Sequence, residues 1–369
     1  MPLHELPHKC KNESNKALEI ITFSWGSGEL SEEKDVNNET LLVWAYPSVT
    51  TEKRQYLLRK YHGINSQTNF FVFVRYNNEW CYFNVTQVFV TDNLPQVKQF
   101  ALVIWASDYN PEKYDNLCRI LSKRYCKTGD PTVVLQLYLS VMTGGVCTTE
   151  ENGMFSLTDF QSRRKPENSD IKDLIKLFGL EIILIYTTLL LNKRLIIYHH
   201  SLDSLLKWVQ IIPYLMVHRN FDGITFPWVH LESDELLNLK CCDGFIAGST
   251  DKGIESLNDM FDVFVNVPAR EVTISPYSRD YFAMTKTHKD IALFIVQLSE
   301  NPNLEEYQII TEIAKKTQEL LSQLRLLASV VTPDGRKVVS IETLKEKNLA
   351  PALESFLFNL SVAEKMIML

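Results

Sequence analysis

The sequence lacks the short motifs that mark common nucleotide-binding and metal-dependent enzymes. It contains no GxxxxGK[ST] loop and no GxGxxG segment after a strand, either of which would bind a phosphate. No HExxH or comparable histidine–carboxylate cluster is present. Gly26-Ser27-Gly28 has no GxSxG context and does not indicate a nucleophile elbow. We therefore expect no catalytic residue, no metal and no cofactor, although a hydrolase site built from dispersed residues stays open.

Cysteine pairs and long hydrophobic runs are also missing. The seven cysteines include no CxxC pair, and the neighbours Cys241 and Cys242 cannot readily bind one ion together, which favours reduced thiols in a cytosolic protein. The longest apolar run, 180–191, is shorter than the roughly 20 residues that cross a bilayer. Residues 1–16 hold no apolar stretch of signal-peptide length. We expect a cytoplasmic protein that associates with membranes only through partners.

Composition and charge set broad limits on the class of protein. The 369 residues, 45% hydrophobic and 22% charged, are typical of a globular chain of two domains, with or without a helical extension. The formal net charge is −7, from 38 basic and 45 acidic side chains, which gives no whole-molecule attraction to nucleic acid. We expect an α/β protein that binds other proteins and no nucleic acid.

The first 145 residues alternate strand patterns with amphipathic helices. Apolar β-branched or aromatic runs predict strands at 18–25, 41–46, 70–75, 80–88 and 100–106. A polar turn at 76–79 predicts a hairpin between the third and fourth of these strands. Helices are expected at 52–61, 111–128 and 132–142. One antiparallel sheet flanked by helices is the simplest architecture.

A composition break at 143–170 follows this block. It contains Gly144-Gly145 and the basic run Arg163-Arg164-Lys165-Pro166, and we predict an interdomain linker over 146–170. The basic triplet could bind phosphate, but a solvated loop is favoured.

Helices and strands alternate from 171 to 278. Strands are predicted at 194–198, 225–231, 244–248, 261–267 and 271–274, and helices at 171–178, 180–191, 202–217 and 234–239. This alternation favours a sheet with helical crossovers. The last block is helical, with helices at 290–299, 309–328 and 352–369. Its spacing is not a sustained heptad, so packing onto the second domain is favoured over a coiled-coil seam.

His199 and His200 follow the predicted strand Arg-Leu-Ile-Ile-Tyr at 194–198. The pair could bind a metal or act as an acid and a base. Adjacent residues on a strand point to opposite faces, however, so ordinary strand-end histidines are favoured over a joint site.

The stretch 180–250 carries a specific order of motifs. These are Leu-Leu-Leu-Asn-Lys-Arg (189–194), Leu-Ile-Ile-Tyr (195–198), His-Ser-Leu-Asp-Ser-Leu (200–205), Phe-Pro-Trp-Val-His-Leu (226–231) and Gly-Phe-Ile-Ala-Gly (244–248), then the strand Phe-Asp-Val-Phe-Val-Asn-Val (261–267). This order resembles the central part of the DENN domain. The block around Tyr46-Pro47-Ser48 resembles the family's longin-like upstream module, and the helical tail resembles its downstream module.

The resemblance covers nearly all of the chain from about residue 17. It implies a longin-like upstream module at 17–145 (an antiparallel sheet with flanking helices), a central α/β module at 171–278 and a helical downstream module at 279–369. The sequence pattern itself predicts the flexible tail at 1–16 and the linker at 146–170.

The resemblance also implies guanine-nucleotide exchange on a Rab GTPase, in endosomal trafficking at the late endosome. An exchange factor makes and breaks no covalent bond. It exchanges contacts to the GTPase switch regions for those that hold Mg²⁺ and GDP. In the family the GTPase sits across the junction of the upstream and central modules, which agrees with the lack of a catalytic motif.

Two loops depart from the family pattern. The proline-rich loop after the third central strand is here Leu231-Glu232-Ser233-Asp234, and Asp243-Gly244 replaces the proline before Phe-Ile-Ile-Gly. These loops help to shape the partner surface in the family. Together with the helical C-terminal block they favour a second function class, a scaffold without exchange activity. Such a scaffold would dock on coiled-coil subunits of an endosomal sorting assembly of the Commander type, and both functions could coexist on separate faces.

Trp44 and Tyr46 are the candidate partner-contact residues. Both lie at the end of a predicted strand beside the turn set by Pro47, where an aromatic side chain can stand exposed as a binding anchor. The alternative is a core tryptophan and a tyrosine with a satisfied hydroxyl, and for Trp44 it is at least as well supported. Gly179 and Gly248 are interpreted as backbone positions only.

Overall fold

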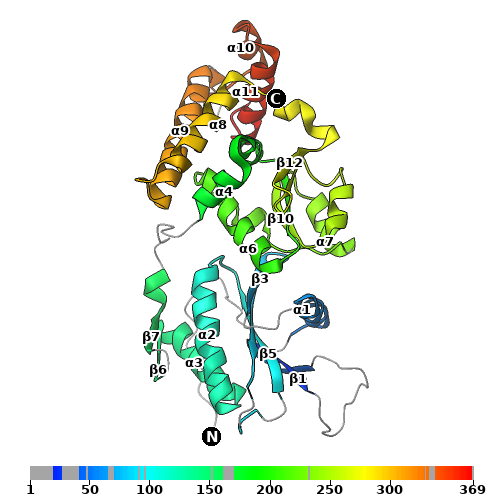
Figure 1. The fold of residues 1–369 in the computed structure, drawn as a ribbon, viewed down its shortest axis with the longest axis vertical. Coiled ribbons are helices and arrows are strands. Elements are labelled where there is room, and N and C mark those ends of the chain that lie inside the picture. The colour runs from blue at the N-terminus through cyan, green and yellow to red at the C-terminus, as the bar shows by residue number, and fades with distance from the viewer. Residues whose placement is uncertain are drawn as a thin grey trace, which may run out of the picture. The chain divides into compact units, whose positions relative to one another are not determined.

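The computed structural model describes residues 20–26, 41–46, 49–64, 70–89, 92–94, 97–150, 153–160, 170–231, 233–328, 330–331 and 337–367. The chain divides into two compact units, Met1–Gln161 and Ser162–Leu369, called unit 1 and unit 2 below. Figure 1 shows both, coloured along the chain. The predicted tail at 1–16 lies outside the described residues.

Unit 1 is built on one five-stranded antiparallel sheet with the strand order β2-β1-β5-β4-β3, which confirms the predicted architecture. The strands are β1 (Ile20–Gly26), β2 (Leu41–Tyr46), β3 (Phe70–Tyr76), β4 (Glu79–Gln87) and β5 (Val97–Ala106). The helices are α1 (Thr51–Gly63), α2 (Pro111–Thr128) and α3 (Pro131–Gly144). Each helix is preceded by a residue whose side chain accepts a backbone N–H of the first turn. These residues are Thr50 for α1, Asn110 for α2 and Asp130 for α3.

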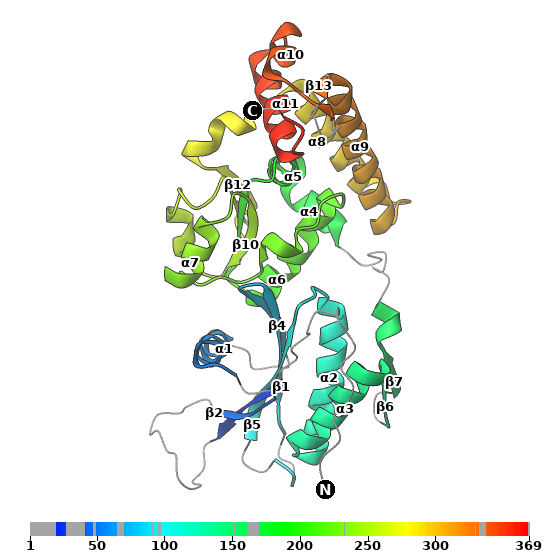
Figure 2. The same ribbon diagram turned by 180° about the vertical axis from the view of Figure 1, so that it is seen from behind.

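The two faces of this sheet are covered by different helices. On one face, Tyr56 of α1 lies 6.5 Å from the Trp105 ring, and the Tyr61 hydroxyl donates to the Gln99 side chain. On the other face, Tyr114 of α2 stacks on Tyr82 with ring centroids 4.3 Å apart. Both faces therefore carry buried aromatic side chains at the centre of the sheet. Figures 1 and 2 show α1 and α2 on opposite sides of it.

The first part of the predicted linker has regular structure. Residues 146–160 form β6 (Val146–Thr149), β7 (Gly153–Ser156) and the 3₁₀ helix η1 (Leu157–Phe160), all within unit 1. The paired glycines that suggested a break instead end α3, because Gly145 has a φ of 76° and its N–H donates to the Val141 carbonyl. Residues 161–169 lie outside the described residues.

Unit 2 contains a second five-stranded sheet with the order β12-β11-β8-β10-β9. Its strands are β8 (Arg194–Tyr198), β9 (Thr225–Phe226), β10 (Phe245–Ser249), β11 (Val263–Asn266) and β12 (Glu271–Ile274). Strands β9, β10, β8 and β11 run parallel, and β12 is antiparallel to β11. The predicted crossovers are present as α6 (Leu202–Ile211), α7 (Ser233–Lys240) and the 3₁₀ helix η5 (Lys252–Ser256).

Both faces of the parallel strands are buried, as expected for uninterrupted apolar strands. On one face, Ile196, Phe245 and Phe264 form a cluster with Leu239 of α7 and Ile254 of η5. The opposite face is covered by α6 and by α5 (Ile182–Leu190), which packs on β8 and β11.

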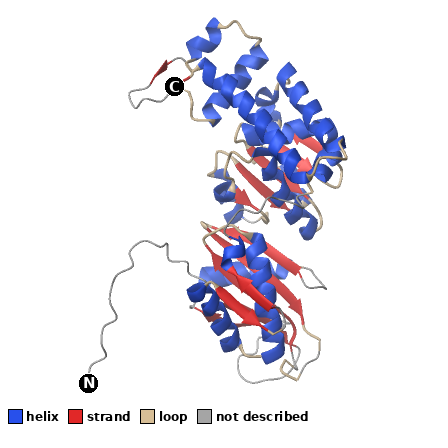
Figure 3. Cartoon of the chain, turned by 90° about the vertical axis from the view of Figure 1, so that its left-hand side faces the viewer, coloured by secondary structure: helices blue, strands red, loops and turns tan. Residues whose placement is uncertain are grey.

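The remaining helices of unit 2 lie beside α5 (Figure 2), and Figure 3 shows the helices of this unit in blue and its strands in red. They are α4 (Ile171–Phe178), α8 (Lys286–Glu300), α9 (Glu306–Leu327), α10 (Ile341–Glu346) and α11 (Pro351–Ala363), with the 3₁₀ helices η2 (Gly179–Glu181) and η6 (Pro276–Phe282) and the short strands β13 (Val330–Val331) and β14 (Lys337–Val338). Helix α9 packs on α4, α8 and the 3₁₀ helix η3 (Ile212–Met216). Packing onto the rest of unit 2, rather than a free coiled-coil seam, is confirmed.

Several predicted boundaries were wrong, and two of the reasons are prolines. The helix expected at 202–217 changes to a 3₁₀ turn at Ile212 because Pro213 has no backbone N–H to continue the α-helix. The strand expected at 225–231 ends at Phe226, directly before Pro227. Helix α10 was not predicted. Among the described residues no helix is long and apolar enough to cross a membrane.

Candidate functional site

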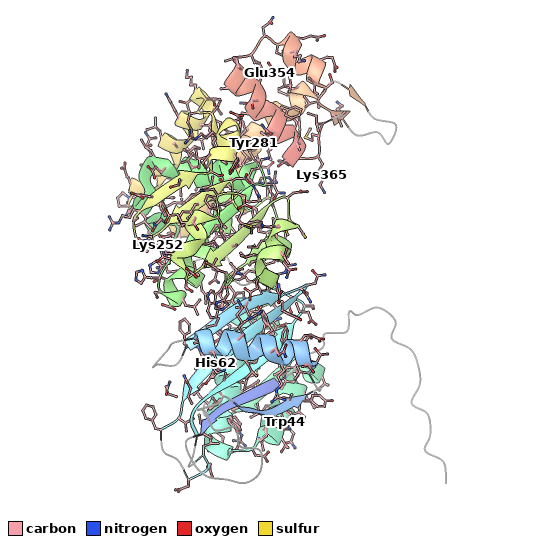
Figure 4. The ribbon with its side chains drawn as sticks, turned by 90° about the vertical axis from the view of Figure 1, so that its right-hand side faces the viewer. Trp44, His62, Lys252, Tyr281, Glu354 and Lys365 are labelled. Atoms are coloured by element: carbon pink, nitrogen blue, oxygen red, sulfur yellow. The ribbon has the colours of Figure 1, made fainter. Side chains whose placement is uncertain are left out.

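The two predicted contact residues lie on β2, the outermost strand of the unit 1 sheet. Trp44 is opposite Thr22 of β1, and Tyr46 is opposite Ile20. Residues two apart on a strand point to the same side, and the two rings are stacked, with centroids 6.3 Å apart and planes 18° apart. β2 therefore presents an aromatic pair at the edge of the sheet, where Figure 4 labels Trp44.

The aromatic pair continues a sheet face that helices cover only in part. The register connects Tyr46 through Ile20 and Ile104 to Tyr82, and residues opposite one another share a face. Tyr82 is the residue against which Tyr114 of α2 stacks. On this face, α2 packs mainly on β4 and β5.

Exposure separates Tyr46 from the core aromatics. Its residue surface is 46% exposed, whereas Trp105 and Trp80 are 0% and 3% exposed. Trp44 is half-buried, so it is neither a fully exposed anchor nor a core tryptophan. A stacked aromatic pair with one exposed ring is the kind of feature that can anchor a protein interface. That the pair contacts a partner stays a prediction, and Pro47, on which part of it rested, lies outside the described residues.

Arg194 and Asp262 form a largely buried ion pair in unit 2 that the sequence patterns did not predict. The Asp262 carboxylate accepts the Arg194 backbone N–H at 2.7 Å, the Arg194 guanidinium at 3.2 Å and the Ser278 hydroxyl at 2.5 Å. Burial would raise the pKa of Asp262, but these donors together hold it below its ordinary value. The pair ties β8 to the segment before β11 and to η6. Both residues belong to motifs noted in the sequence. No sequence pattern indicated that they would be in contact, because they are 68 residues apart.

The two histidines are not arranged as predicted. β8 ends at Tyr198, so the alternation of strand faces does not apply to His199 and His200, and their rings stack with centroids 4.5 Å apart. The His199 Nδ1 accepts the Ser201 backbone N–H at 2.9 Å, just before α6 begins. Burial, and then the neighbouring His200, lowers the pKa of His199, which favours a neutral ring. Within the described ranges, no group of three or more His, Cys, Asp or Glu residues could hold a metal ion.

Two glycines of unit 2 are required by close backbone approaches. A Cβ at Gly244, where the family pattern has proline, would come within 2.1 Å of the Asn192 carbonyl oxygen, so no side chain fits there. A Cβ at Gly248 would come within 2.3 Å of the Pro227 carbonyl oxygen. The departure at Gly244 is thus built into the packing of β10 against the residues before β8.

Comparisons with known proteins agree with this arrangement. The family model described as "Stabilization of polarity axis" matches residues 168–276, which include the whole parallel sheet of unit 2.

Similarity to individual proteins extends over both units. The chain is 40% identical over 337 residues to DENN domain-containing protein 10 of Danio rerio, covering 91% of this chain and 96% of that protein. It is 38% identical to DENN domain-containing protein 10 of Homo sapiens, covering 91% and 94%. The protein of the same name from Dictyostelium discoideum is 31% identical over 348 residues, covering 90% and 95%. The chain therefore belongs to the DENN domain family, in the group of DENN domain-containing protein 10.

Proposed function

We propose that this chain is a Rab GTPase regulator, a guanine-nucleotide exchange factor of the DENN type that acts in endosomal membrane trafficking. The observation that carries the proposal is the similarity to DENN domain-containing proteins over 91% of the chain. The chain would bind the switch regions of the GTPase and promote release of GDP. In this proposal it works at the late endosome and reaches the membrane through its partners.

Exchange of this kind places a specific demand on the protein. It must bind the nucleotide-free GTPase more tightly than the GDP-bound form, because only a difference in affinity shifts the equilibrium. No proton transfer or covalent intermediate is involved, so rigid contact surfaces are sufficient. The stacked pair Trp44 and Tyr46 is our candidate for part of such a surface, since exposed aromatic side chains bury a large area with little loss of conformational freedom.

Release of a fluorescent GDP analogue tests the exchange proposal. We expect that a catalytic amount of the chain accelerates release of mant-GDP from at least one member of a panel of Rab GTPases. Tyr46→Ala should weaken the effect, whereas Tyr277→Ala removes an equally large tyrosine, 77% exposed on η6 of unit 2, and should leave it unchanged. No acceleration with any Rab would contradict exchange activity. Equal activity of both variants would contradict the assigned contact residue alone.

A second candidate is a scaffold that docks on coiled-coil subunits of an endosomal sorting assembly. The observations that favour it are the helical C-terminal block and the two loops that depart from the family pattern, Leu231-Glu232-Ser233-Asp234 and Asp243-Gly244. Stable pull-down of a coiled-coil partner, lost with Tyr46→Ala and retained with Tyr277→Ala, would support the scaffold. Combined with unaccelerated mant-GDP release, that result would replace the exchange proposal.

A further inference from the structure

The two five-stranded sheets have four edges, at β2, β3, β9 and β12. An edge strand leaves a row of backbone N–H and C=O groups that another strand can pair with, and proteins usually protect such rows. β9 ends directly before Pro227, and the pairing of β2 with β1 contains a bulge. On β3, the Tyr56 hydroxyl donates to the Arg75 carbonyl, and Phe73 is only 3% exposed. The fourth edge, β12, has none of these features.

The outward backbone groups of β12 belong to Val272 and Ile274. The Ser275 N–H donates to the Asp262 carbonyl, so Thr273, two residues earlier, also directs its backbone groups at β11. Val272 and Ile274 alternate with these residues and therefore direct theirs away from the sheet. Along the strand, exposed residues alternate with these two half-buried ones, so solvent reaches this edge.

A carboxylate from another element is hydrogen-bonded to this edge. The Val272 N–H donates to the Glu181 side chain at 3.3 Å, and Glu181 lies on η2, 91 residues earlier. Among the described residues, Ile274 makes no hydrogen bond on the outward side. The Glu181 oxygen thus accepts where the carbonyl of a neighbouring strand would accept. Because Glu181 is an exposed surface side chain, an incoming strand can take its place.

We propose that β12 is the docking edge for an extended segment of a partner protein, which adds a strand to the unit 2 sheet and places a basic side chain beside Glu181. The backbone of the added strand would pair with Val272 and Ile274. Its side chains would alternate, with one set against the apolar side chains of Val272 and Ile274. The displaced Glu181 carboxylate would pair with a lysine or arginine of the partner. The site lies in unit 2, so it is separate from the aromatic pair on β2 and goes beyond the function proposed above.

A basic partner strand fits this edge better than a second copy of the chain does. Two β12 strands paired about a two-fold axis would bring both Glu181 carboxylates to one interface, because each lies at its own edge. The exposed Glu271 of β12 would add another carboxylate from each copy. Like charges that face one another across paired strands are destabilising. A basic segment instead neutralises Glu181.

Binding of synthetic peptides to the full chain tests the proposal. The probe is a fluorescent peptide of about eight residues, an ordinary strand length, in which valine alternates with lysine. One comparison peptide carries glutamate in place of lysine, and another is methylated on its central backbone nitrogens and cannot donate hydrogen bonds. We expect the lysine peptide to bind at least tenfold more tightly than either, by fluorescence anisotropy. Equal binding of the methylated peptide would indicate simple attraction to a chain of net charge −7 and would overturn the proposal, as would no binding at all.

Variants of β12 separate its backbone from its side chains. Ile274→Pro removes the outward N–H, whereas the pairing with β11 uses Thr273 and Ser275 and stays intact, as is usual for proline at a sheet edge. Binding of the lysine peptide should fall at least tenfold. Ile274→Ala shortens the same side chain but keeps the N–H, and should retain most of the binding. An equal loss in both variants would overturn the proposal.

Glu181 supplies an independent test of the charge preference. Glu181→Lys should reverse the preference between the lysine and glutamate peptides, whereas Glu255→Lys, at an exposed glutamate of η5, should leave it unchanged. An unaltered preference in Glu181→Lys would overturn the proposal, and this result decides if Ile274→Pro fails to fold by circular dichroism. The proposal is also overturned if the wild-type chain self-associates in analytical ultracentrifugation and Ile274→Pro abolishes that association, because the occupant would then be a second copy.

Discussion

Single side chains in unit 2 join strands that are distant in the sequence, and the clearest case is Asp262. Replacing it by asparagine would place an amide against the Arg194 guanidinium and leave that charge uncompensated. Removing one partner of a buried pair costs roughly 3 to 5 kcal/mol. We expect the lower end, about 3 kcal/mol, because the Arg194 side chain keeps 27% of its surface exposed. Urea unfolding monitored in unit 2 measures the loss. Asp259→Asn, at the neighbouring and largely exposed carboxylate, is the control and should change stability little.

The same contact predicts a dependence on pH. The pKa of Asp262 is lower in the folded protein than in the unfolded chain. The unfolded state therefore binds the proton more readily, and the stabilising effect is present above the unfolded pKa of about 4 and lost as the pH falls through the folded pKa. The Asp262→Asn variant should lack this part of the acid dependence. If the difference in unfolding free energy between wild type and Asp262→Asn stayed the same down to pH 2, this explanation would be contradicted.

His288 provides a second prediction with its own pH range. The residue is 2% exposed, its Nδ1 accepts the Thr285 backbone N–H, and its ring packs on Phe356 of α11. Burial lowers the pKa of His288 to about 4, and its Nε2 has no hydrogen-bonding partner. Because the unfolded histidine titrates near 6.5, full stability is present above that pH and up to about 3 kcal/mol is lost as the pH falls toward 4.

Hydrogen exchange of peptides from α8 and α11 measures this effect locally. Wild-type protection should fall between pH 6.5 and 4, after correction for intrinsic exchange, and His288→Gln should remove that part of the fall. The exposed His62 on α1 serves as the control, since His62→Gln should leave the profile of α8 unaltered. An identical profile for wild type and His288→Gln would show that the histidine is not held neutral by burial.

At the scale of elements, β10 can pack closely against Pro227 and α6 because Gly248 has no side chain. A Cβ at position 248 would lie 2.3 Å from the Pro227 carbonyl oxygen and 3.0 Å from Val209 of α6. The carbonyl belongs to the backbone and cannot rotate away, so we expect Gly248→Ala to destabilise unit 2 by about 1 to 3 kcal/mol through overpacking. Thermal unfolding measures this. Gly223→Ala meets nothing within 4 Å and should be close to neutral, so similar losses in both variants would contradict the packing explanation.

Element boundaries show where local patterns are sufficient. The hairpin turn was predicted from four polar residues, and Tyr76 and Glu79 do pair across it. The β6–β7 hairpin was missed because Gly144 and Gly145 look like a break, although a positive φ at Gly145 only ends a helix. Four-residue strands with one exposed face carry too little apolar pattern to be distinguished from a loop.

At the scale of the whole molecule, the two proposed functions place the same demand on the chain, a surface that binds another protein. The aromatic pair on β2 is the candidate contact in both. Exchange factors and scaffolds both act by binding, so neither proposed function requires a catalytic group. The tests proposed for the two functions use the same variants, Tyr46→Ala and Tyr277→Ala, and differ in what is measured, GDP release or retention of a coiled-coil partner.

The sequence by itself determined the class of fold, the order of most elements and the family. These features depend on periodicity, turns and motifs within short stretches, which local physical preferences encode directly. Only the tertiary structure decided that Arg194 meets Asp262 and that Tyr46 is exposed while Trp105 is buried. Contacts between distant residues follow from how strands pair and helices cover them, and no local pattern contains that information.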